Sequence, residues 1–104
     1  MTVLKKIDVL NDNVAVLRDI EMPDGIMADQ AALEKISNEG IIVGVGPDAG
    51  IVQPGDRVIF YPKKYLEMRP ASGGYEGKSV LVVRKADLVV RIGKTDKYEF
   101  VDKV

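Results

Sequence analysis

The clearest strand signal in the chain is the run Gly40-Ile41-Ile42-Val43-Gly44-Val45-Gly46. Its β-branched residues favour extended backbone. Glycines at intervals within such a run indicate a strand that bends or carries a bulge, as tightly curved β-barrels require. The run therefore favours a curved, all-β fold.

Further short apolar runs lie on both sides of this stretch. One follows an Asn/Asp turn cluster at Asn11–Asn13, and another follows Pro54-Gly55, where proline presets φ and glycine supplies a positive φ. In order, the runs are Val14–Leu17, Arg57–Phe60, Ser79–Val83, Leu88–Ile92 and, as a candidate terminal strand, Tyr98–Val101. Short strands between Gly/Pro turns, with little helical periodicity, predict an all-β barrel or sandwich.

The size and charge of the chain indicate one folded domain, residues 1–104, without a strong electrostatic field. It has 104 residues, of which 46% are hydrophobic and 30% charged, values typical of a globular protein. Fifteen basic and sixteen acidic side chains give a formal charge of −1. A balanced charge does not favour nucleic acid or anionic membranes as partners, so we expect neither.

Cysteine and histidine are both absent from the sequence. Their absence removes the usual zinc ligands, cysteine nucleophiles and the commonest general base near neutral pH. We therefore expect a protein that is not an enzyme and that holds no metal or cofactor. No apolar run approaches the roughly 20 residues of a membrane span, and Met1–Lys6 lacks the apolar core of a signal peptide, so a cytoplasmic location is expected.

The segment Asp19–Glu39 is a polar connection without a strand pattern. Structureless connections longer than about 12 to 15 residues are uncommon in compact domains and are often functional. One interpretation is a short helix, because Ala32, Leu33 and Ile36 have helical spacing after a candidate N-cap at Asp29. The other is a long mobile loop that exposes an apolar bait, Gly25-Ile26-Met27, for a partner to cover.

These blocks, in this order from Ile7 to Ile92, resemble the GroES or chaperonin-10 family. The family's opening Pro-Leu-x-Asp-Arg-Val-x-Val appears as Val9–Val16 without the proline and the basic residue, and its Val-x-Ala-Val-Gly-x-Gly strand is echoed by Ile42–Gly46. The pattern Val-x-x-Gly-Asp-x-Val-x-Phe reads here as Val52–Phe60 without a gap, and the closing pair of apolar strands is similar to Val80–Ile92. The match is distributed along the chain.

The resemblance implies a small GroES-like β-barrel whose subunits form a heptameric ring. Such a ring is the lid of an ATP-dependent GroEL-type chaperonin and encloses folding client proteins, and the ATP is bound by the chaperonin. The residues implied to bind the chaperonin are Gly25, Ile26, Met27 and Ala28. The ring would form by pairing the first strand of one subunit with the last strand of its neighbour, which implicates Leu10, Val14 and Val16 against Leu88, Val90 and Ile92.

Three stretches depart from the family pattern. Many members insert a hairpin that roofs the dome where this chain has only Pro47–Ile51, which predicts an open roof. Tyr61–Gly77 is longer than its counterpart, and residues 94–104 form a C-terminal extension. Bacteriophage-encoded co-chaperonins vary in such places, so the departures suggest a phage origin and, with it, the host cytoplasm.

Other functions remain open from the residues alone. Phe60–Arg69 interleaves aromatic and basic side chains, as nucleic-acid-binding barrels do, although solvated lysines beside a core Phe60 explain it as well. Zinc-dependent alcohol dehydrogenases contain a GroES-like domain, but their Cys and His ligands are absent here. A scaffold or viral structural barrel without chaperonin binding is a further alternative, because Ala28 is smaller than the family's usual leucine.

Overall fold

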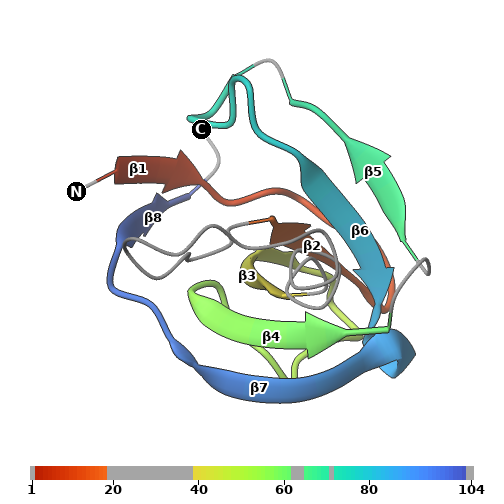
Figure 1. The fold of residues 1–104 in the computed structure, drawn as a ribbon. Helices are drawn as coiled ribbons and strands as arrows, with labels where there is room; N and C mark the ends of the chain where they lie inside the picture. Colours follow the sequence, from red (N-terminus) through yellow and green to blue (C-terminus); the bar gives the residue numbers. More distant parts are fainter. Residues whose placement is uncertain (1, 19–38, 62–64, 71, 103–104) are drawn as a thin grey trace, which may run out of the picture.

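The computed structural model describes residues 2–18, 39–61, 65–70 and 72–102. Within these ranges the chain forms strands joined by turns and a single 3₁₀ turn, Lys85–Asp87, which confirms the predicted all-β class (Figure 1). The strands are β1 Thr2–Lys5, β2 Asn13–Leu17, β3 Glu39–Val45, β4 Asp56–Phe60, β5 Leu66–Met68, β6 Val80–Arg84, β7 Leu88–Lys94 and β8 Tyr98–Val101. The six strands expected from the sequence are all present, and β1 and β5 are additional.

The strands form two sheets. Six of them make a sheet in the order β5-β6-β2-β3-β4-β7, in which every neighbouring pair is antiparallel. The other two, β1 and β8, pair in parallel although they come from opposite ends of the chain (Figure 1). Among the described residues β5 and β7 are the two ends of the larger sheet, so closure into a barrel remains a prediction.

The core lies on both faces of the six-stranded sheet. Strand β2 shows this best, because Val14 and Val16 belong to one buried cluster, whereas Ala15 and Leu17 belong to the other. The first cluster includes Phe60, Val58 and Leu81, and the second is covered by Leu4 of β1 and by Tyr75. A strand buried on both faces has a continuous apolar sequence rather than an alternating one, which is the pattern of Val14–Leu17.

The predicted irregularity of the glycine-containing strand is also present. The register between β2 and β3 shifts between Ala15 and Val16, which leaves Val43 without an opposite residue. At Gly44 the chain entering β2 passes so closely that an added Cβ would lie 2.4 Å from the carbonyl oxygen of Ile7. Glycine is therefore needed here because another segment of backbone occupies the space of a side chain.

The Pro54-Gly55-Asp56 turn forms as the sequence predicts. Gly55 has a φ of 96°, in the region that glycine adopts without steric cost. The carboxylate of Asp56, which is 5% exposed, accepts a hydrogen bond from the backbone N–H of Gln53 at 2.8 Å. This bond satisfies the buried carboxylate and fixes the entry into β4.

The burial of Tyr75 predicts that the stability of this fold falls at alkaline pH. Its side chain is buried in the second cluster, its hydroxyl donates a hydrogen bond to the carbonyl of Lys5, and burial raises its pKa from 10.0 to about 12. Between these two values the unfolded chain loses the phenolic proton while the folded chain keeps it. The free energy of unfolding should therefore be unaffected by this group below pH 10.0 and should fall as the pH rises toward 12.

Urea denaturation at a series of alkaline pH values measures this dependence, with Tyr75→Phe as the comparison. The variant should lose about 1 kcal/mol at neutral pH, because the hydrogen bond to Lys5 is absent. Its stability should then decline less steeply than that of the wild type between pH 10.0 and 12. Equal slopes for the two proteins would show that Tyr75 is not the group responsible.

Candidate functional site

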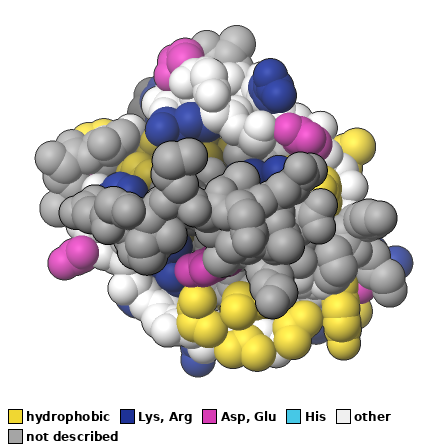
Figure 2. Space-filling view, viewed as in Figure 1, with side chains coloured by type: hydrophobic (Ala, Val, Ile, Leu, Met, Phe, Trp, Pro, Cys, Tyr) yellow, Lys and Arg dark blue, Asp and Glu magenta, His cyan; other side chains and the backbone are white. Residues whose placement is uncertain are grey.

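Strand β7 exposes apolar side chains at one end of the six-stranded sheet. Val89, Val90 and Ile92 are 48%, 46% and 47% exposed, and Ile51 beside them is 61% exposed. We call these four residues the β7 surface. Figure 2 shows hydrophobic side chains gathered along the lower edge of the molecule, where Figure 1 places β7. A group of exposed apolar side chains on an edge strand is a favourable place for another chain to pair.

Two bulges explain why β7 is exposed along most of its length. Opposite β4, the register passes from Leu88 directly to Val90 and from Arg91 directly to Gly93. Val89 and Ile92 therefore have no opposite residue on β4. Bulges twist a strand and change the direction of its side chains, and here every residue from 89 to 94 is exposed.

Polar contacts hold β7 in place beneath this surface. Nη1 of Arg91 donates to the carbonyl of Ile51 at 3.1 Å and lies 3.7 Å from Oδ2 of Asp56, the carboxylate that also fixes the β4 turn. Leu88 packs against the first core cluster. The strand is thus anchored to the domain by Leu88 and Arg91, while its valines and Ile92 remain accessible.

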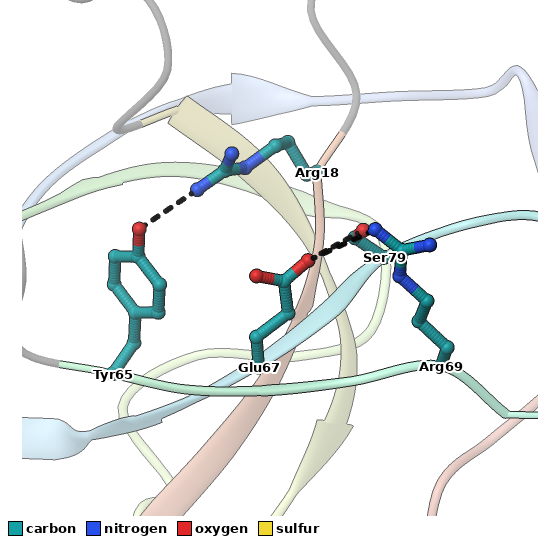
Figure 3. A network of polar contacts seen from close by, with 5 residues as sticks. All are labelled: Arg18, Tyr65, Glu67, Arg69 and Ser79. Carbon is teal, nitrogen blue, oxygen red and sulfur yellow. Dashed lines mark hydrogen bonds and ion pairs between the residues drawn. The ribbon is translucent and has the colours of Figure 1, made fainter.

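The opposite end of the sheet, β5, carries a second exposed apolar side chain and a polar network (Figure 3). Leu66 is 69% exposed and borders a groove lined also by Asn13, Tyr65, Val82, Arg84 and Asp87. Oε1 of Glu67 accepts a hydrogen bond from the Ser79 hydroxyl at 2.8 Å and lies 3.9 Å from the Arg69 guanidinium. These contacts support a strand of only three residues.

Arg18 and Tyr65 connect the end of β2 with the start of β5. Nη2 of Arg18 donates to the Tyr65 hydroxyl at 3.1 Å, and the guanidinium lies 5.6 Å from the centroid of the tyrosine ring (Figure 3). The Tyr65 ring in turn meets the buried Phe60 ring edge-on, with the centroids 6.0 Å apart. The buried Nε of Arg18 has no hydrogen-bond partner among the residues that the structure describes.

The strands that flank the segment predicted as the connection Asp19–Glu39 lie side by side, and Glu39 itself is the first residue of β3. Leu17 of β2 is opposite Ile41 of β3, so the strands that the connection joins are hydrogen-bonded neighbours. The backbone N–H of Arg18 donates to the carbonyl of Ser79 at 3.2 Å, and Arg57 pairs with Glu39 at 3.2 Å. Antiparallel neighbours need only two residues to connect them, so the length of this connection is not required by the sheet.

The residues predicted from the sequence occupy different environments. Val14 and Val16 are fully buried, and both edges of β2 are paired within the chain, so these two side chains belong to the domain's own core. Leu10 is 69% exposed in the turn before β2. Val90 and Ile92 are exposed on the β7 surface, and Leu88 is half-buried. The chaperonin-binding residues Gly25, Ile26, Met27 and Ala28 lie outside the described residues.

Two aromatic rings of the candidate nucleic-acid segment Phe60–Arg69 are packed within the chain. Phe60 is 1% exposed and lies in the core, and Tyr65 is engaged by Phe60 and Arg18, so neither ring is free to stack on a base. Within residues 2–18, 39–61, 65–70 and 72–102, no cluster of three or more His, Cys, Asp or Glu side chains could hold a metal ion. The same ranges contain no helix that is long and apolar enough to cross a membrane.

No protein-family model matches the chain, and no curated protein matches it. The features that bear on function are therefore those of the chain itself: the β7 surface, the β5 edge and the long connection between β2 and β3.

Proposed function

We propose that this chain is a co-chaperonin: a subunit of a ring-shaped lid that binds an ATP-dependent GroEL-type chaperonin and encloses folding substrate proteins. In this function the chain transforms nothing chemically, and ATP is bound by the chaperonin. The proposal starts from the ordered motifs between Ile7 and Ile92, which resemble co-chaperonins. The all-β fold of the described residues is compatible with it.

The observation that carries the proposal is the connection between β2 and β3. It joins two strands that are already hydrogen-bonded to each other, so its length serves no purpose in building the sheet. Within it, Gly25-Ile26-Met27-Ala28 provides an apolar segment. Burying one such large side chain in a partner's groove contributes about 1.5 to 3 kcal/mol, and ordering the segment costs part of this gain.

Ring assembly makes such weak single contacts effective. When the apolar segment of one subunit has bound the chaperonin, the segments of the other subunits are held close to their own binding sites. Their binding is then almost intramolecular, so the affinity of the whole ring exceeds that of one segment without any new kind of contact. The β7 surface is the part of the described chain best suited to hold subunits together. The interface proposed here uses Val90 and Ile92, with Leu88 beneath them, and does not use the buried Val14 and Val16.

Native mass spectrometry of the chain, alone and with an ATP-loaded chaperonin ring, tests the proposal. We expect a closed oligomer, a heptamer by resemblance, for the chain alone. We expect a complex of that oligomer with the chaperonin when ATP is present and much less of it without ATP. A monomer that never binds the chaperonin would exclude the co-chaperonin function.

A scaffold or viral structural protein is the second candidate, and the β7 surface favours it. This surface could support assembly whether or not the β2–β3 connection binds anything. The same mass spectra separate the two functions, because a scaffold forms the oligomer but no complex with the chaperonin.

A further inference from the structure

The six-stranded sheet exposes apolar side chains at both of its ends. Strands β5 and β7 are its first and last members, and each pairs with one strand only within the described residues. Leu66 is the most exposed residue of β5, and Val90 and Ile92 are exposed on β7. We propose that the outer edge of β7 in one copy pairs with the outer edge of β5 in a second copy. This deepens the proposed ring assembly by naming the surface that receives β7.

The directions of the strands suit this pairing. All neighbours in the sheet are antiparallel, and the sheet has an even number of strands, so β5 and β7 run in opposite directions. A second copy placed beside the first in the same orientation therefore brings its β5 antiparallel to β7. The alternation of the sheet continues across the boundary, and the subunits share one extended sheet.

One register matches the side chains of the two edges. If Arg91 of β7 lies opposite Glu67 of the second copy's β5, their opposite charges face each other. The antiparallel register then places Ile92 opposite Leu66 and Val90 opposite Met68, so apolar side chains meet apolar ones. Cross-strand pairs of both kinds stabilise a sheet, whereas like charges directly opposite destabilise it.

The same register also agrees with the faces of the sheet. Residues that lie opposite each other on neighbouring strands are on the same face, and the succession Met68, Val80, Leu17, Ile41 and Arg57 is such a row across the sheet. Ile59 lies two residues after Arg57 and is therefore on the same face. Val90 is opposite Ile59, so Met68 and Val90 share this face. Glu67 is opposite Leu81, and Arg91 is opposite Val58.

Leu81 and Val58 belong to the same core cluster and therefore lie on the same face of the sheet. Glu67 and Arg91, which are opposite them, share that face, and it is the face that does not carry Met68 and Val90. In a continuous sheet the pair Met68–Val90 and the pair Glu67–Arg91 thus each fall on one face, as direct pairing requires.

Pairing between two copies of β7 is less favourable. An antiparallel pair centred on the middle of the strand would place Arg91 opposite Arg91 of the second copy. Such a two-fold contact also ends at a dimer. A contact between two different edges repeats from subunit to subunit and can close into a ring.

Cysteine cross-linking tests the pairing in the full chain, which contains no cysteine of its own. Directly opposite residues have Cβ atoms about 4.5 to 5.5 Å apart, close enough for a disulfide after a small adjustment. Under oxidising conditions Leu66→Cys/Ile92→Cys should give a ladder of disulfide-linked multimers on a non-reducing gel. Each single variant should run as a monomer on that gel, as should Leu66→Cys/Lys94→Cys, which is two residues out of register.

Four results would overturn the inference. Ile92→Cys alone giving a linked dimer would show a two-fold pairing of β7. Leu10→Cys/Ile92→Cys giving the ladder in place of the Leu66 pair would assign the contact to the turn before β2. A wild-type oligomer whose Leu66 pair does not cross-link would exclude β5, as would a wild-type monomer in native mass spectra. Binding to the chaperonin is measured separately. If the chain binds the chaperonin but cross-links through Leu10, the β5–β7 pairing is wrong and the proposed co-chaperonin function still stands.

Discussion

Replacing Ile26 with serine should abolish co-migration with the ATP-loaded chaperonin while the ring stays assembled. The reason is that every subunit of the ring carries the change. Each loses most of the 1.5 to 3 kcal/mol that a buried isoleucine contributes, a loss of roughly tenfold to a hundredfold for one contact. Because the contacts of a ring act together, the losses multiply and the complex should disappear from native mass spectra.

Ile20→Ser is the matched control for this experiment. It makes the same chemical change within the same β2–β3 connection, outside the segment Gly25–Ala28 that the resemblance assigns to the chaperonin. We expect Ile20→Ser to bind the chaperonin almost as well as the wild type. Normal binding by Ile26→Ser would place the contact elsewhere, and equal losses in both variants would show that the connection contributes without a specific bait.

Most of the strands that the sequence predicts share a feature that β5 lacks. Runs such as Val80–Arg84 contain several β-branched residues in succession, and this local preference survives in the fold. By contrast β5 is Leu66-Glu67-Met68, which has no β-branched residue and is a strand because it pairs with β6. β1 pairs with β8 from the far end of the chain. Pairing partners at such distances leave no local pattern in a sequence.

The candidate site could be predicted only in part, for a related reason. An apolar strand can be buried by its own chain or exposed for another chain, and the run Leu88–Ile92 does not differ much from Val14–Leu17 in composition. The structure separates them, because β2 has neighbours on both edges and a cluster on each face, whereas β7 is at the end of the sheet. The one difference in the sequence is that Val14–Leu17 is continuously apolar, whereas Leu88–Ile92 contains Arg91. A continuous apolar run indicates a strand that is buried on both faces.

The exposure of Leu66 had no signal in the sequence. A single leucine between Tyr65 and Glu67 is compatible with a core position as much as with a surface one. Its position at the sheet edge depends on β5 pairing with β6 and on the contacts of Arg18, Tyr65 and Ser79 around it. These contacts join segments far apart in the chain, so only the folded structure shows them together.

Gly46→Ala should destabilise the domain by about 3 kcal/mol, at the upper end of what overpacking costs. A Cβ at this position would lie 2.3 Å from the carbonyl oxygen of Asn11 and 2.9 Å from that of Asn13. Both oxygens are already hydrogen-bonded, to the N–H groups of Asp48 and Gly46 at 3.0 Å and 2.8 Å. The backbone cannot move away without breaking these bonds, which join the turn before β2 to the segment that follows β3.

Gly50→Ala provides the matched control, because a Cβ there would meet no heavy atom within 4 Å and its φ is not positive. That variant should gain about 0.4 to 1 kcal/mol, since alanine restricts the unfolded chain more than glycine does. Thermal denaturation at one fixed protein concentration compares the two, because assembly makes the melting temperature depend on concentration. Gly46→Ala should lower the Tm by roughly 12 °C or more, and Gly50→Ala should raise it slightly. Equal melting temperatures would mean that the backbone of Asn11 does not approach Gly46 so closely, and the glycine spacing of residues 40–46 would then need another explanation.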